Sequence, residues 1–146
     1  MITLAYEDLH AELTEYGFTE FGPKRDDRYY IPRKEWLEKF LGWLRRHRKK
    51  YCPENCDCED IMFHVVASAG AALERNKKAS AGNPVCCAVW ESATEFGDFM
   101  GEQFQGRHAS CIVRLREGWF VVDGGACAAC PLDELGLGLR PVFVWL

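Results

Sequence analysis

Asn55-Cys56-Asp57-Cys58-Glu59-Asp60 stands directly before an apolar, helix-like stretch that runs from Ile61 to Leu73. Asp57 suits an N-cap, and the two acids after Cys58 would lie in the first helical turn, where the helix dipole favours negative charge. The pattern therefore predicts a helix from Cys58 to about Glu74. A cysteine at such a position is a candidate nucleophile, because free backbone amides lower the pKa of its thiol.

Two later segments, His108 to Arg116 and Trp119 to Asp123, have the composition of paired strands, and Glu117-Gly118 between them indicates a tight turn. With this turn, His108 and Asp123 share a face but are offset by four residues, roughly 13 Å along straight strands. That distance is too long for direct contact. The glycines at 124 and 125, a bulge or a shifted register must bring the acid closer.

Together these residues suggest a thiol-dependent acyl-transfer site, in which Cys58 attacks a carbonyl, His108 carries the proton and Asp123 orients the imidazole. The acids beside Cys58 oppose its ionisation, so an imidazolium would have to supply most of the stabilisation of the thiolate. Spacing alone leaves another interpretation open. Cys58 could equally be a small buried residue, His108 a strand-end residue and Asp123 a turn former.

Several short motifs resemble a known family, the small papain-like domains related to the C-terminal domain of a fungal agglutinin and seen in phage and bacterial proteins. The matching segments span about residues 29–125. They are Tyr29-Tyr30-Ile31-Pro32, the Trp36 helix, Tyr51-Cys52-Pro53-Glu54, Asp57-Cys58-Glu59-Asp60, Arg107-His108-Ala109 and Gly118-Trp119-Phe120-Val121-Val122-Asp123.

This resemblance implies a papain-like cysteine peptidase with Cys58 as nucleophile, His108 as base and Asp123 as orienting acid, acting on a peptide or protein substrate. No glutamine precedes Cys58 in the connector, so the amide of Cys58 and the side chain of Asn55 are the available donors to an oxyanion. No cofactor is required. The resemblance also implies a possible calcium dependence, with Asp57, Glu59 and Asp60 as oxygen ligands, although helix capping explains these acids equally well.

Two other classes of function remain open. Cys52, Cys56, Cys127 and Cys130 could form a structural zinc site, because zinc prefers four soft ligands in a tetrahedron. The chain could also be a catalytically silent papain-like domain that serves as a binding protein or a phage accessory protein.

The whole chain, 1–146, is expected to form a single α+β domain, papain-like or transglutaminase-like, with N-terminal helices packed on an antiparallel sheet. Residues 4–16 and the stretch around Trp36 to His47 have helical periodicity, residues 85–90 suit a central strand, and Phe96, Phe99, Met100 and Phe104 have helical spacing. A helical turn at 131–135 and a strand after Pro141 complete the expected elements.

The net charge of -4 gives no general attraction to nucleic acid or to an anionic membrane. The N-terminus does not have the features of a signal peptide, and no apolar stretch approaches the roughly 20 residues that span a bilayer. We therefore expect a cytoplasmic protein whose eight cysteines are mostly thiols. The oligomeric state cannot be predicted from these patterns.

Overall fold

The computed structural model describes residues 2–47, 57–74, 81–93, 96–136 and 138–146. The helices are α1 (Tyr6–Tyr16), α2 (Lys34–Arg46), α3 (Cys58–Glu74) and the short 3-10 helix η1 (Leu132–Glu134). The strands are β1 (Thr3–Ala5), β2 (Glu20–Phe21), β3 (Arg28–Tyr30), β4 (Val85–Ser92), β5 (Gly97–Phe99), β6 (Glu102–Phe104), β7 (Arg107–Leu115), β8 (Gly118–Asp123), β9 (Ala128–Pro131) and β10 (Leu139–Trp145). This content confirms the predicted α+β class.

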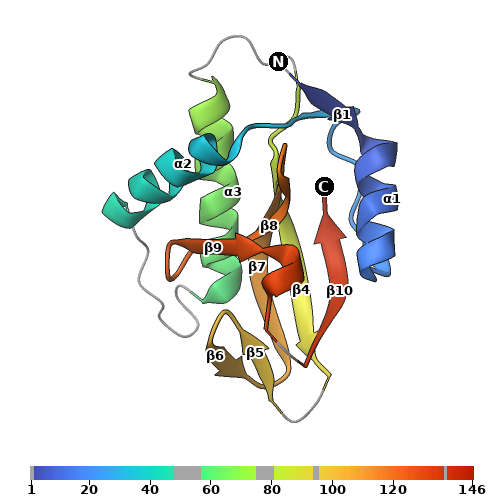
Figure 1. Ribbon diagram of the computed structural model, residues 1–146, viewed down its shortest axis with the longest axis vertical. Helices are drawn as coiled ribbons and strands as arrows, with labels where there is room; N and C mark the ends of the chain where they lie inside the picture. The colour runs from blue at the N-terminus through green and yellow to red at the C-terminus, as the bar shows by residue number, and fades with distance from the viewer. Residues whose placement is uncertain (1, 48–56, 75–80, 94–95, 137) are drawn as a thin grey trace.

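A six-stranded sheet in the order β2-β10-β4-β7-β8-β9 forms the centre of the molecule (Figure 1). All its neighbours pair antiparallel except β2, which runs parallel to β10. Two small antiparallel sheets, β1-β3 and β5-β6, lie outside it. No described helix is long and apolar enough to cross a membrane.

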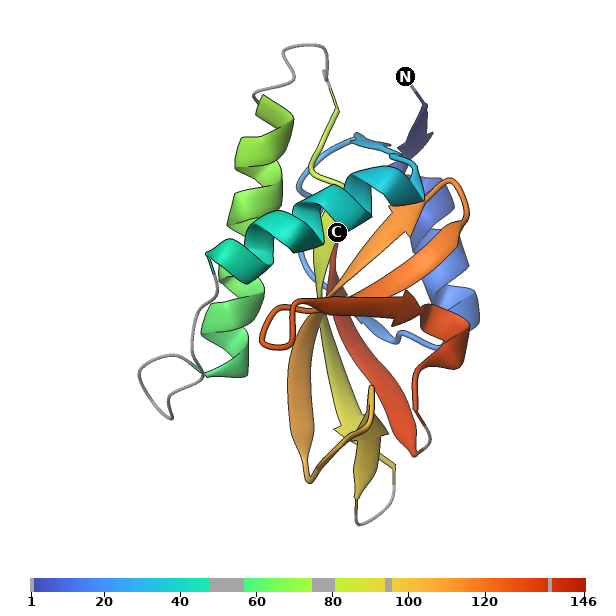
Figure 2. The same cartoon turned by 60° about the vertical axis from the view of Figure 1, so that its left-hand side comes forward.

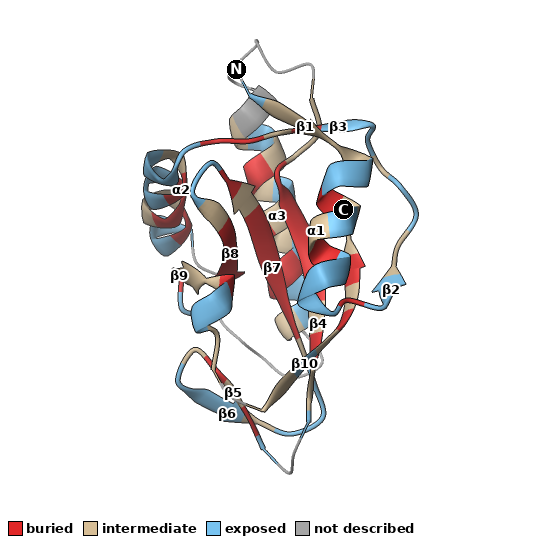
Figure 3. Ribbon diagram, turned by 45° about the vertical axis from the view of Figure 1, so that its right-hand side comes forward, coloured by how far each residue is buried: buried red, intermediate tan, exposed pale blue. Residues whose placement is uncertain are grey.

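Helices cover both faces of this sheet, with α1 on one side and α2 and α3 on the other (Figure 2). Alternation along β7 divides the core accordingly: Cys111 and Val113 join the cluster under α2 and α3, whereas Ile112 joins the cluster under α1. The buried strands lie between the partly exposed helices, as expected for a sheet covered on both faces (Figure 3). The predicted packing of N-terminal helices on the sheet is therefore confirmed.

The start of α3 agrees with the sequence-based prediction. The carboxylate of Asp57 accepts hydrogen bonds from the backbone N–H groups of Glu59 at 3.0 Å and Asp60 at 3.3 Å. The N–H of Asp57 in turn donates to the carboxylate of Asp60 at 3.3 Å. This reciprocal capping fixes Cys58 as the first residue of the helix.

The hairpin of β7 and β8 is present, but its predicted register is wrong by two residues. Leu115 pairs with Gly118, so the turn consists of Arg116 and Glu117 rather than Glu117 and Gly118. Distant contacts hold this turn in place. The N–H of Arg116 donates to the carbonyl of Pro32 at 2.9 Å, and the Glu117 carboxylate accepts from the N–H of Lys34 at 3.1 Å, at the start of α2.

The helical interpretation of residues 96–104 is wrong, because this segment forms the β5–β6 hairpin. Met100 and Gly101, between the two strands, both have positive φ, 51° and 87°, which no α-helix accommodates. Apolar side chains at 96, 99, 100 and 104 mimic a helical period. The glycines at 97, 101 and 106 indicate turns and argue against a continuous helix.

Candidate functional site

A hollow of about 710 Å³ lies where α3 begins and where β7 and β8 end. We call it the His108 hollow. It brings together the three residues that the sequence singled out, Cys58, His108 and Asp123. Its other lining residues are Ile61, Met62, Glu102, Phe104, Arg107, Ala109, Ser110, Cys111, Gly124, Gly125 and Ala126.

Cys58 enters the hollow from the first position of α3 and is half-buried. It packs against the core cluster beneath α2 and α3. One turn further along the helix, the carbonyl of Met62 accepts a hydrogen bond at 3.3 Å from the thiol of Cys111 on β7. This contact ties the start of α3 to the sheet, so that the position of Cys58 is fixed by tertiary packing as well as by its cap.

His108, the second residue of β7, is half-buried among aromatic rings. Its ring centroid lies 4.4 Å from that of Phe99 and 5.5 Å from that of Phe104. Burial lowers the pKa of His108, and the carboxylates of Asp123 and Glu102 offset that effect only in part. Its Nε2 is buried and has no hydrogen-bond partner among the described residues. The surroundings therefore favour a neutral imidazole with unused hydrogen-bonding capacity.

Asp123 ends β8, and the shifted register brings it closer to His108. Because Cys111 pairs with Val122, the next step along both strands places Asp123 beside Ser110, two residues from His108. A two-residue diagonal on paired strands spans about 7–8 Å, compared with roughly 13 Å in the predicted register. The carboxylate of Asp123 accepts a hydrogen bond from the N–H of Gly125 at 3.0 Å. The observed register of β7 and β8 therefore produces the shorter distance between His108 and Asp123 that the sequence analysis required.

The three side chains line one hollow but are not linked into a hydrogen-bonded triad. Among the described residues, no hydrogen bond joins His108 to Cys58 or to Asp123. Alternation along β7 explains part of this arrangement. His108 lies on the same side of the sheet as Phe99, which belongs to the cluster under α1. Cys58 packs against the cluster under α2 and α3, on the other side of the sheet. The thiol and the imidazole therefore approach the hollow from opposite faces of β7.

The edge of β7 beside the hollow is open. Residues from Arg107 to Val113 pair with β4, but the ladder to β8 begins only at Cys111. Along Arg107 to Ser110, therefore, no described strand pairs with the side of β7 that faces away from β4. Alternate residues of a strand direct their N–H and C=O groups to each side. This short edge lies directly against the hollow, because all four of these residues line it.

The structure describes only some of the remaining predicted site residues. Asn55, Cys52 and Cys56 lie outside the described residues. Cys127 packs against the cluster under α2 and α3, whereas Cys130 packs against the cluster under α1. The carboxylates of Asp57 and Asp60 take part in the cap, and Glu59 is exposed. Among the described residues, no three histidine, cysteine or acidic side chains form a metal-binding group. The zinc and calcium sites stay predictions.

Sequence reasoning missed Glu102 and Phe104, which line the hollow from β6. The helical interpretation of residues 96–104 did not connect this segment with His108. The glycines at 97, 101 and 106, read as turn signals, would have indicated a hairpin in front of β7.

Comparison with solved structures finds neighbours that share this fold. One is a complex of PSL1a with E64, with a TM-score of 0.71 and 14% identity, covering 99% of this chain and 51% of that one. Another is the Polyporus squamosus lectin bound to the human-type influenza-binding epitope Neu5Aca2-6Galb1-4GlcNAc, with a TM-score of 0.69 and 13% identity. That match covers 99% of this chain and 49% of the lectin. The chain thus spans about half the length of both neighbours.

No family model matches the sequence, and no curated protein matches it. At this level of identity the structural matches show a common fold with a fungal lectin. This agrees with the resemblance to an agglutinin that the motifs indicated.

The prediction of a hydrolase, and of a cysteine protease in particular, is overturned. The neighbour named by its activity is a lectin, a binding protein, and neither neighbour is described as a peptidase. The geometry gives a physical reason for the correction. The predicted mechanism depends on an imidazolium beside the thiolate, but burial lowers the pKa of His108, and its Nε2 makes no hydrogen bond to Cys58.

Proposed function

We propose that this chain is a binding domain on a papain-like scaffold, and that it holds an extended segment of a peptide or protein in the His108 hollow. The open edge of β7 from Arg107 to Ser110 is the observation that carries this proposal. An extended peptide can add to such an edge as a further strand. Its backbone then supplies hydrogen bonds, and alternate side chains enter the neighbouring pocket.

The lining of the hollow suits such a ligand. Ile61, Met62 and Phe104 offer apolar surface, and the carboxylate of Asp123 can accept hydrogen bonds from amide groups. The unpartnered Nε2 of His108 gains a partner when a polar ligand atom enters, which offsets the cost of its burial. In this proposal Cys58, His108 and Asp123 are ligand contacts. The thiol of Cys58 forms part of the wall.

The test begins with a displayed library of random heptapeptides selected on the immobilised chain. The strongest binder is then measured by isothermal titration calorimetry against three proteins. We expect His108→Phe to weaken binding about three- to tenfold, as for the loss of one hydrogen bond, and Asp123→Asn to weaken it about tenfold. His10→Phe is the matched control, because His10 stacks on Phe21 at 3.8 Å, outside the hollow.

A second set of peptides tests strand addition directly. Methylation of alternate backbone nitrogens in the selected peptide removes donors to the β7 edge and leaves the side chains unchanged. Binding should be lost for one methylation pattern and retained for the other, since alternate residues face the strand. Failure to select any peptide, or equal affinity for both patterns, would overturn the proposal.

Carbohydrate is the second candidate ligand, favoured by the lectin that shares the fold. A glycan array probed with the same chain distinguishes the two. Binding to glycans without binding to peptides, weakened by Asp123→Asn, would assign the His108 hollow to sugar recognition.

We place the protein in a reducing cytoplasm. The six described cysteines, all free thiols, support that compartment.

A further inference from the structure

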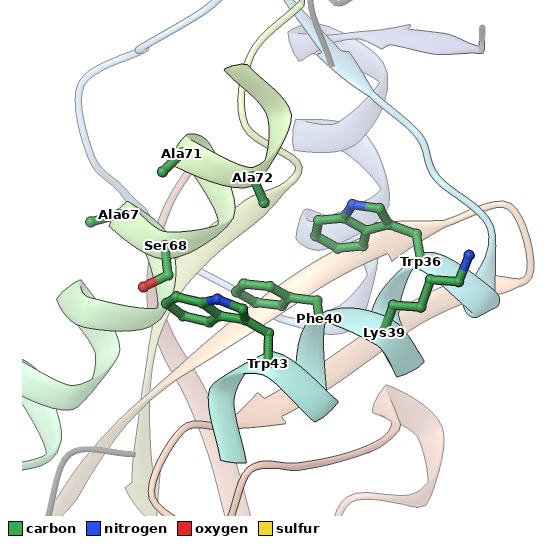
Figure 4. Close-up of a pocket in the computed structure, with 8 residues that line it drawn as sticks. All are labelled: Trp36, Lys39, Phe40, Trp43, Ala67, Ser68, Ala71 and Ala72. Carbon is green, nitrogen blue, oxygen red and sulfur yellow. The ribbon is translucent and has the colours of Figure 1, made fainter. Parts of the chain in front are cut away.

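A second concavity lies between α2 and α3, away from the His108 hollow, and shares no lining residue with it. We call it the helical groove. It encloses about 400 Å³. Bulky residues of α2 face small residues of α3 across it (Figure 4). The lining residues are Trp36, Lys39, Phe40 and Trp43 from α2, and Ala67, Ser68, Ala71 and Ala72 from α3.

Three aromatic rings on α2 form one wall. Trp36 and Phe40 are nearly parallel, at an interplanar angle of 14° and a centroid distance of 5.2 Å. Phe40 and Trp43 are also parallel, at 5° and 6.4 Å. Phe40 is buried, whereas both tryptophans remain only partly buried and pack at the margin of the core. The wall therefore keeps apolar ring surface in contact with water, and a ligand could cover it.

The opposite wall explains why the groove is open. Ala67 and Ala71 are exposed on α3, and Ser68 and Ala72 are partly buried beside them. Methyl and hydroxymethyl groups are short, so space remains where large side chains would otherwise interdigitate. The volume lies within the range of about 300–1,000 Å³ that is usual for small-molecule sites.

Lys39 gives the groove its charge. It lies on α2 between the two tryptophans in sequence, is exposed, and lines the groove. Among the described residues its ammonium group forms no ion pair, although Glu35 and Glu38 are close to it in sequence. Ser68 is the other non-aromatic polar side chain in the lining. An apolar slot with an unpaired cation in its lining complements a ligand with an apolar body and one negative group.

We propose that the helical groove binds a small amphipathic anion. Its apolar chain or ring system lies between the tryptophan rings and the alanine wall, and its carboxylate or sulfonate pairs with Lys39. This proposal is independent of the function assigned to the His108 hollow, because it uses different residues, which lie further along α3 than those of the hollow.

Two dyes with the same aromatic body separate the two parts of this proposal. 1-Anilinonaphthalene-8-sulfonate carries an anionic group, and N-phenyl-1-naphthylamine is its neutral analogue. We expect the native chain to bind the anionic dye at one site, about tenfold more tightly than the neutral dye, as for one charge-assisted hydrogen bond. Fluorescence titration gives the affinity, and dodecanoate should displace the dye whereas dodecanol should displace it poorly.

Variants assign the site. Lys39→Gln should weaken the anionic dye about tenfold and leave the neutral dye unchanged. Lys34→Gln is the matched control, because Lys34 lies on the same helix outside the groove. Ala71→Leu should weaken both dyes by filling the groove, and since Ala71 is exposed, the fold should persist by circular dichroism. Ala67→Leu repeats this test at a second position.

Three results would overturn the proposal. They are equal affinity for the two dyes, an unchanged affinity of Lys39→Gln for the anionic dye, and unchanged binding in both alanine variants. Dye binding at many weak sites, as in a loosely packed state, counts against it as well.

Discussion

The helical groove and the His108 hollow differ in how the chain builds them. The groove is formed by two helices, and its aromatic wall comes from positions 36, 40 and 43 on one face of α2, a spacing visible in the sequence. The hollow collects side chains from α3, β6, β7 and β8 and from the turn after β8. Its chemistry is therefore set by tertiary contacts, and perturbing those contacts should affect the hollow while sparing the groove.

The largest expected effect concerns thiol reactivity. Cys86 is buried, and burial raises its pKa to about 12. At neutral pH its thiolate fraction is then roughly a thousandfold smaller than that of an ordinary cysteine. Cys58, half-buried in the wall of the hollow, should react with iodoacetamide far sooner than Cys86 or Cys111, as followed by mass-spectrometric site mapping. In denaturant the difference should disappear. Equal rates in the native protein would show that the hollow does not expose Cys58.

The next effect tests how closely β8 approaches α3. A Cβ on Gly124 would lie 2.5 Å from Cγ2 of Val65 and 2.7 Å from Cγ2 of Ile61. Gly124→Ala should therefore lower the free energy of unfolding by about 1–3 kcal/mol, as in overpacked cores. In urea denaturation, Gly125→Ala should behave like the unmodified chain, since its Cβ would meet only a carboxylate oxygen of Asp123 at 3.4 Å. Equal losses in the two variants would contradict the packing described here.

A smaller effect should follow removal of the cap of α3. Asp57→Ala leaves the N–H groups of Glu59 and Asp60 without their carboxylate acceptor. We expect a loss of about 1 kcal/mol in the free energy of unfolding. Glu59→Gln, in the same turn, should cost much less, because its side chain makes no described capping bond. Dye binding in the helical groove should persist in Asp57→Ala, because the cap lies at the N-terminus of α3 and the groove residues lie near its C-terminus.

The smallest effect is a pH dependence of stability. Burial lowers the pKa of His108 in the folded chain, so the unfolded chain binds a proton first as the pH falls. The contribution of the neutral imidazole is present above the unfolded-state pKa of roughly 6.5 and declines below it, toward the lower folded-state pKa. Urea unfolding at pH 7.5 and at pH 5 should therefore differ less for His108→Leu than for the unmodified chain. An identical pH dependence in both proteins would show that His108 is not the responsible group.

Some parts of the fold were decided by local sequence. The N-cap of Asp57, the helix that it opens, the aromatic face of α2 and the two strands of the β7–β8 hairpin depend on contacts between near neighbours. Local patterns therefore predicted them. They also identified Cys58, His108 and Asp123, which the fold brings to one hollow.

Other parts depended on contacts between residues far apart in the chain. Pro32 and Lys34 fix the turn at Arg116 and Glu117, and this sets the register that brings Asp123 toward His108. The hairpin at 97–104 places Phe99 and Phe104 around the imidazole, and their burial of it favours the neutral form.

The sequence by itself thus determined which residues could take part in a site. Only the tertiary structure decided their faces, the neutral form that is favoured at His108 and the open edge of β7, because burial and strand register arise from packing between segments that are remote in sequence.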